Sequence, residues 1–182
     1  MALVIHPSDR TTAFLQSVYG GLRDVTVLTQ SSTPEEIRKA VHHLPRGERL
    51  LALGHGSAVG LYSRDGDSGP FTRIILGHGH SYYLRGRTDI VGIWCHADEF
   101  ARKEHLHGLF SGMIISDIEE AADCGVVTSE EELDRENPLL ASRLGMLLGS
   151  GIPLRDIPAI MPELDTGRTE LTEFNYRNFH FL

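Results

Sequence analysis

The sequence predicts a three-layer α/β/α fold built on a mainly parallel sheet, and two observations carry this prediction. Short apolar runs alternate with segments of helical periodicity along the first half of the chain. These runs are apolar nearly throughout, as in strands that helices cover on both faces. With 182 residues, of which 41% are hydrophobic, the chain has the size and composition of one domain, residues 1–182.

Charge and cysteine content exclude several classes of partner. The formal net charge is −8, so no basic surface is available to bind a nucleic acid or an anionic membrane. No segment is apolar enough to span a membrane, and the N-terminus lacks the basic residues of a signal peptide. Cys95 and Cys124 are too few for a disulfide framework. We therefore expect a cytoplasmic protein with reduced thiols.

The first five predicted elements alternate as β-α-β-α-β. The second helix has the clearest start, because Thr33 can cap it, Pro34 suits its first position and Glu36 completes a capping box. Such an alternation favours parallel pairing of the strands, with helices on both faces of the sheet. The predicted elements are strands at 2–5, 25–28 and 50–53 and helices at 11–22 and 34–44.

The rest of the chain carries shorter signals. A long loop is predicted from Gly56 to about Thr72, and long loops in compact domains are usually functional. The prolines between Pro153 and Pro162 argue against regular structure there. Further elements are strands at 90–94 and 112–115, an apolar run at 73–76, and helices at 82–84, 98–105, 118–124 and 139–148.

Two predicted strands end in residues that can act together in catalysis. The third strand is followed by Gly54-His55-Gly56 and the fourth by Cys95. The carboxyl ends of parallel strands meet at one edge of the sheet, where α/β folds bind ligands. A thiolate can attack a carbonyl carbon, and an imidazole can protonate the leaving amine. We predict Cys95 as nucleophile, His55 as general acid and base, and the N–H groups of Gly56 and Cys95 as oxyanion donors.

These motifs resemble those of the caspase, legumain and gingipain group of cysteine peptidases. The resemblance lies in Leu50-Leu51-Ala52-Leu53-Gly54-His55-Gly56 and Ile90-Val91-Gly92-Ile93-Trp94-Cys95, and the α/β layout extends it over residues 1–125. Short, uncharacterised bacterial proteins with His-Gly-Ser and Trp-Cys motifs are also similar. The resemblance implies a caspase-like sheet of strand order 2-1-3-4-5 and a peptide or protein substrate, with no cofactor. Because Trp94-Cys95-His96 departs from the caspase Gln-Ala-Cys-x-Gly signature, cleavage after aspartate is not implied.

The remaining histidines allow two different interpretations of the site. His78 lies in a second Gly-His-Gly, but too few residues separate it from Cys95 for a crossover helix and a strand, so it ranks below His55. A zinc enzyme is also conceivable, although none of the recognised ligand spacings occurs and we predict no metal site. The candidate ligands are His55, His78, His80, Cys95, His96, His105 and His107.

Acidic and aromatic residues are candidates for binding a substrate or a partner. Asp98 and Asp117 follow the fourth and fifth strands and could form a pocket for a basic side chain, although both positions also suit helix capping. Trp94 and Cys124 are expected to serve packing. A non-catalytic protein-interaction module on the same scaffold is the main competing function. An aromatic C-terminal tail could form an edge strand or dock on a second copy in a homo-oligomer; it contains Phe174, Tyr176, Phe179 and Phe181.

Overall fold

A computed structural model describes residues 1–64 and 69–182, and one mixed sheet forms its centre. The strands of this sheet are β1 (Ala2–Ile5), β2 (Val25–Leu28), β3 (Arg49–Leu53), β7 (Ile90–Ile93), β8 (Gly108–Ser111) and β9 (Phe179–Phe181). Within the described residues the order is β2-β1-β3-β7-β8-β9. The first five strands in this order pair in parallel, and β9 pairs antiparallel with β8. The predicted α/β class and mainly parallel sheet are confirmed.

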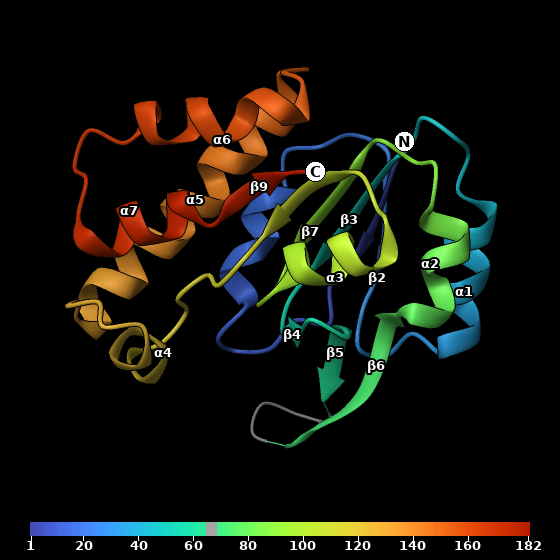
Figure 1. Ribbon diagram of the computed structural model, residues 1–182, viewed down its shortest axis with the longest axis horizontal. Coiled ribbons are helices and arrows are strands. Elements are labelled where there is room, and N and C mark those ends of the chain that lie inside the picture. Colours follow the sequence, from blue (N-terminus) through green and yellow to red (C-terminus); the bar gives the residue numbers. More distant parts are fainter. Residues whose placement is uncertain (65–68) are drawn as a thin grey trace.

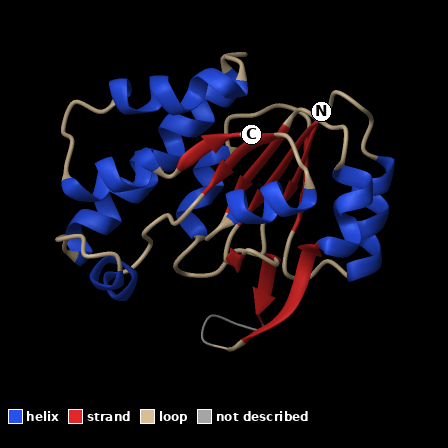
Figure 2. Cartoon of the chain, in the orientation of Figure 1, coloured by secondary structure: helices blue, strands red, loops and turns tan. Residues whose placement is uncertain are grey.

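Successive residues of each strand point to opposite faces of the sheet, and helices cover both faces (Figure 2). Leu3 and Ile5 pack with α1 (Pro34–His43), α2 (His78–Leu84) and α3 (Ala97–Glu104). The other face carries Ala2 and Val4. Its covering elements are η1 (Ala13–Val18), α5 (Glu130–Gly149), η2 (Leu154–Asp156), α6 (Ile157–Ile160), η3 (Met161–Leu164) and α7 (Glu170–Arg177).

Helix starts follow local capping chemistry. Thr33 Oγ1 accepts a hydrogen bond from the Glu36 N–H at 3.2 Å, and Glu36 Oε2 accepts one from the Thr33 N–H at 2.7 Å. The predicted capping box of α1 is therefore confirmed. In contrast, the helix start predicted at residue 139 is wrong, because Ser129 caps a helix that runs on through Pro138. Its buried stripe is continuous across the proline, and packing outweighs the one lost N–H group.

The segment predicted as a long loop contains a second, antiparallel sheet of order β4-β5-β6 among the described residues. Its strands are β4 (Gly56–Ser57), β5 (Gly60–Arg64) and β6 (Phe71–Gly77). Leu61 and Leu76 of this sheet reach the core. Leu76 belongs to the apolar run predicted at 73–76, whereas the glycine-rich composition around Leu61 predicted a loop. Figure 1 shows the small sheet directly beyond the carboxyl end of β3. Residues 65–68 of the predicted loop lie outside the described residues.

Three further predictions need correction. The first helix is the short η1, and the proline-rich segment forms η2, α6 and η3 where no regular structure was predicted. The strand predicted at 112–115 is instead β8, four residues earlier. The backbone N–H groups of Met113 and Ile115 donate to the side chains of Asn178 and Asn175, so this segment cannot continue the ladder. It leads into α4 (Ile118–Asp123), whose cap is Asp117.

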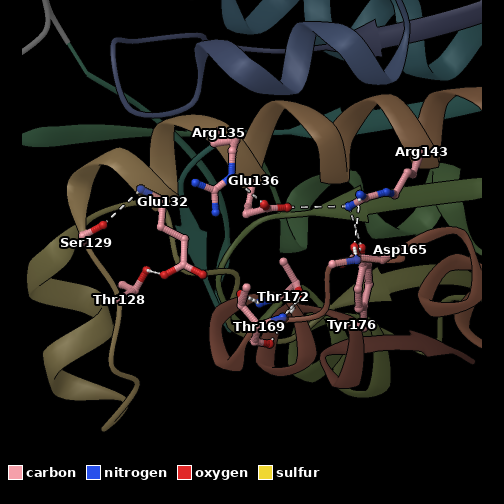
Figure 3. Close-up of polar contacts among 11 residues, drawn as sticks. Thr128, Ser129, Glu132, Arg135, Glu136, Arg143, Asp165, Thr169, Thr172 and Tyr176 are labelled. Carbon is pink, nitrogen blue, oxygen red and sulfur yellow. Dashed lines mark hydrogen bonds and ion pairs between the residues drawn. The ribbon is translucent and has the colours of Figure 1, made fainter.

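The aromatic tail forms the edge strand β9 and the preceding α7. Phe179 is 5% exposed and packs in the core. A polar network joins this region to α5: Tyr176 Oη donates to Asp165 at 2.9 Å, and Arg143 donates to both (Figure 3). The tail therefore packs within its own chain, and a homo-oligomer remains a prediction that the structure does not test.

No helix in the described ranges combines the length and apolar character that a bilayer span requires.

Candidate active site

The two glycines around His55 are needed for the geometry of this turn. Gly54 has φ +140°, a backbone conformation that side chains with a Cβ rarely adopt. A Cβ at Gly56 would clash with the Trp94 ring and with the Gly60 carbonyl. The Gly54 N–H donates to the Ile93 carbonyl at 3.0 Å, which ties the end of β3 to the end of β7. The sequence therefore holds His55 rigidly at the carboxyl edge of the sheet.

Cys95 lies in the turn between β7 and α3. The preceding residue, Trp94, is fixed by Ser111, whose Oγ accepts from the Trp94 N–H at 3.0 Å and donates to its carbonyl at 2.9 Å. Trp94 is buried against Phe100, as predicted from its position on the strand. Its indole N–H also donates to the Ser57 carbonyl at 3.1 Å. These contacts leave Cys95 half-buried on the opposite side of the turn.

His55 and Cys95 line one small cavity. It has a volume of about 20 Å³, which is room for roughly one water molecule, and Ile93 and Ile114 contribute apolar walls. Among the described residues, no hydrogen bond joins the imidazole to the thiol. The structure thus brings the predicted pair to one site without forming the contact that proton transfer needs.

A carboxylate that the sequence analysis missed accompanies His55. Asp9 Oδ2 lies 3.1 Å from His55 Nε2, and Thr11 Oγ1 lies 2.8 Å from the same nitrogen. The Thr11 hydroxyl donates its proton to Asp9 Oδ1 at 3.0 Å, so it accepts from His55. His55 Nε2 is therefore the donor, and in the neutral ring Nδ1 is left as the basic nitrogen.

Asp9 is buried in an environment that keeps it ionised. Burial opposes the charge, but His55 and the hydroxyls of Thr12 and Thr11 hold the pKa of Asp9 well below its usual range. Arg64 of β5 also contacts Asp9 Oδ2. The sequence did carry a signal, since Asp9 follows β1 and β1 pairs with β3. Its carboxyl end therefore meets the same sheet edge, although Pro7-Ser8-Asp9 alone predicts a turn.

The thiol of Cys95 is neutral at physiological pH. Burial raises its pKa to about 12, and the nearby negative charge of Glu120 adds to this effect. Backbone N–H groups of Ile114 and Cys95 itself act in the opposite direction and do not outweigh it. Burial also raises the pKa of Glu120, whose Oε2 accepts from the Ser116 hydroxyl at 2.8 Å. Nucleophilic chemistry at Cys95 would therefore need a base to remove its proton.

The three remaining predicted site residues do not line the His55–Cys95 cavity. Gly56 is paired with Leu61 in the small sheet and does not line the His55–Cys95 cavity, and its oxyanion role stays a prediction. Asp98 pairs with Arg102 at 3.8 Å within α3 and lies outside that cavity. Asp117 caps α4 through the Glu120 N–H at 2.9 Å and also lines a neighbouring cavity.

The rival histidine lies at a different place. His78 Nδ1 is 2.8 Å from the Glu104 carboxylate, and the side chain of His78 is 83% exposed. It lines a separate cavity of about 370 Å³. Cys95 does not line that cavity, so the structure gives His78 no thiol partner. Within the part of the chain that the structure describes, no group of three or more His, Cys, Asp and Glu residues is placed to hold a metal ion.

The arrangement Asp9–His55 beside Cys95 has the parts of an acyl-transfer site: an orienting carboxylate, an imidazole and a thiol. The comparisons with known proteins add no family, because no protein-family model and no curated protein matches the chain. The chemistry and geometry of Asp9, His55 and Cys95 therefore have to indicate the function.

Proposed function

We propose that this protein is a thiol-dependent peptidase or amidohydrolase, with Cys95 as nucleophile, His55 as general acid and base, and Asp9 as the carboxylate that orients His55. The observation that carries the proposal is the shared cavity of His55 and Cys95, with Asp9 on the Nε2 side of the imidazole. The order of the parallel strands, β2-β1-β3-β7-β8, supports a caspase-like sheet once the small sheet is counted separately.

The reaction would proceed in two halves. Cys95 Sγ attacks the carbonyl carbon of the substrate amide while its proton passes to His55 Nδ1. The C–N bond then breaks, the imidazolium gives this proton to the leaving amine, and a thioester remains. Water attacks the thioester with His55 as base, which releases the carboxylic acid and restores the thiol. Asp9 stabilises the imidazolium that forms in each half.

The raised pKa of Cys95 determines when the thiol would lose its proton during the reaction. Burial and the negative charge of Glu120 favour the neutral thiol of Cys95 over a resting thiolate. Proton transfer therefore has to accompany attack, and a bound substrate must bring His55, Cys95 and the carbonyl carbon together. A small neutral alkylating reagent should accordingly react slowly with Cys95, whereas a peptide-based electrophile that fills the site should react faster.

A peptidyl acyloxymethyl ketone tests the proposal. It should label Cys95 and spare Cys124, as read by peptide mass mapping, and His55→Ala should slow the labelling by about 100-fold, the contribution typical of a general base. A Cys124→Ser variant serves as the matched control and should label at the parent rate. Equal labelling of both cysteines, independent of His55, would overturn the proposal.

Two observations favour a second candidate, a non-catalytic interaction module. The neutral thiol and the missing His55–Cys95 hydrogen bond among the described residues are what a degenerate site would show. On this hypothesis the peptidyl electrophile and iodoacetamide would rank the two cysteines in the same order, because only thiol exposure and pKa would decide reactivity. A reversal of that order between the two reagents supports the enzyme.

A further inference from the structure

A second cavity adjoins the His55–Cys95 cavity. Its volume is about 270 Å³, and Phe14 and Ser116 line both cavities, which makes them neighbours. The other walls come from the segment after β1, the start of α4 and the first half of α5. Figure 3 shows how Arg143, farther along α5, is held by Asp165, so the helix that forms this wall is anchored in the core. The second cavity is therefore a built extension of the candidate active site.

Carboxylates dominate the charge of this second cavity. Asp117, Glu130 and Asp134 line it, and Arg10 is its single basic residue among the described residues. Asp117 is half-buried, whereas Glu130, Asp134 and Arg10 are exposed. One oxygen of Asp117 caps α4, and the other accepts no hydrogen bond within the described residues. Three carboxylates against one guanidinium give the cavity a formal charge that favours a cation.

A buried acceptor without a donor also points to a ligand in this cavity. Asn137 lines the cavity and is 4% exposed, yet its Oδ1 has no hydrogen-bond partner within the described residues. Pro138 has no N–H group, so the Asp134 carbonyl lacks its usual donor in α5. The hydroxyl protons of Thr11 and Ser116 are already given to Asp9 and Glu120. The cavity therefore offers several acceptors and has few donors of its own to satisfy them.

We infer that this cavity binds the positively charged side chain of a peptide substrate, arginine in preference to lysine. A guanidinium supplies five N–H donors in a plane, which suits a wall of carboxylate and carbonyl oxygens better than a point-like ammonium. Phe14 lines both cavities and adds apolar surface for the aliphatic stem of such a side chain. This inference rests on the proposed function, since it places the carbonyl next to the bound side chain beside Cys95. Asp117 contributes to the pocket, and Asp98 does not.

Matched electrophiles test the inference. Two peptidyl acyloxymethyl ketones that differ only in arginine against citrulline, its neutral isostere, should label Cys95 at rates that differ by about tenfold or more. Asp117→Asn and Asp134→Asn should each reduce this ratio several-fold, and asparagine at position 117 can still cap α4. Asp98→Asn makes the same charge change outside the cavity and should leave the ratio unchanged. Arg10→Gln should raise it.

These measurements distinguish a failure of the arginine pocket from a failure of the proposed catalytic function. Equal rates for the arginine and citrulline electrophiles, with labelling that still depends on His55, would overturn the pocket and leave the proposed function standing. Labelling that ignores His55 would overturn the proposed function. The pocket is then judged by calorimetric titration of a Cys95→Ala protein with acetyl-arginine amide and acetyl-citrulline amide. At least tenfold tighter binding of the arginine compound supports the pocket, and equal binding overturns it.

Discussion

The tripeptide Gly-His-Gly occurs twice in this chain, at residues 54–56 and 77–79, and the two copies have different surroundings. Each histidine pairs with a buried carboxylate that also contacts an arginine: His55 with Asp9, and His78 with Glu104. The side chain of His55 is 16% exposed and lines a cavity with a thiol, whereas that of His78 is 83% exposed at the start of α2. A carboxylate–histidine pair therefore indicates catalysis only where a nucleophile shares its cavity.

The last glycines of the two copies, Gly56 and Gly79, differ in how closely they are packed. Gly56 has no space for a Cβ, because the Trp94 ring and the Gly60 carbonyl are too near. Gly79 has no atom within 4 Å of an added Cβ among the described residues. Gly56 is therefore fixed by packing at the end of a sheet strand, whereas Gly79 lies in the exposed first turn of α2.

Alanine at the two glycines should give the largest difference between these regions. Gly56→Ala is expected to lower the free energy of unfolding by about 3 kcal/mol, because both clashing groups are held in the core. Gly79→Ala should leave stability equal or raise it by about 0.5 kcal/mol, since alanine favours a helix. Urea denaturation of both variants measures this. Similar losses in the two would contradict the packing difference.

Removal of the two histidines should separate their roles in reactivity. His55→Ala is expected to slow labelling of Cys95 by a peptidyl electrophile about 100-fold, because the base next to the thiol is lost. His78→Ala should change that rate by less than about twofold, since His78 lines a different cavity. Labelling kinetics under identical conditions compare them, and a matching loss in His78→Ala would break the distinction.

Loss of the Asp9 or the Glu104 charge should lower the stability of the fold by a similar amount, but only Asp9 should affect the reactivity of Cys95. Asp9→Asn and Glu104→Gln should each cost about 2 kcal/mol at pH 7, because each removes a buried charge from an arginine and a histidine. Only Asp9→Asn should also slow Cys95 labelling, by about tenfold.

The pKa of Asp9 is lowered by folding, so its stabilisation is present above the ordinary carboxyl pKa of 3.8 and is lost as pH falls below it.

That pH dependence can be measured directly. The stability difference between the parent protein and Asp9→Asn should shrink as thermal unfolding is followed from pH 6 down to pH 3. A difference that stays constant over this range would mean that Asp9 is not ionised in the folded protein.

The smallest expected effect concerns the thiol itself. Folding raises the pKa of Cys95 from 9.0 to about 12, so the associated stability is present below pH 9 and is lost as pH rises towards 12. At pH 10 the loss should be about 1 kcal/mol, and Cys95→Ser should abolish this part of the alkaline dependence. Stability curves at pH 8 and pH 10 measure it. Identical pH slopes for parent and Cys95→Ser would show that the thiol is not buried as described.

The sequence by itself determined the local features. Apolar runs set the strands that carry His55 and Cys95, the Thr33 capping box set the start of α1, and the strand-end argument named both residues of the candidate pair. These features follow from periodicity and from groups within a few residues of one another, which is the range over which sequence patterns have physical meaning.

Tertiary structure decided which of these features act together. Asp9 joins His55 from 46 residues away, across the pairing of β1 with β3, and no local pattern marks it as anything but a turn residue. The position of β8 depended on side chains of Asn175 and Asn178 that accept hydrogen bonds from a segment about 60 residues earlier. The choice between His55 and His78 likewise depended on which cavity holds the thiol. Burial and long-range pairing make these decisions, because they depend on distances in space that the order of residues does not contain.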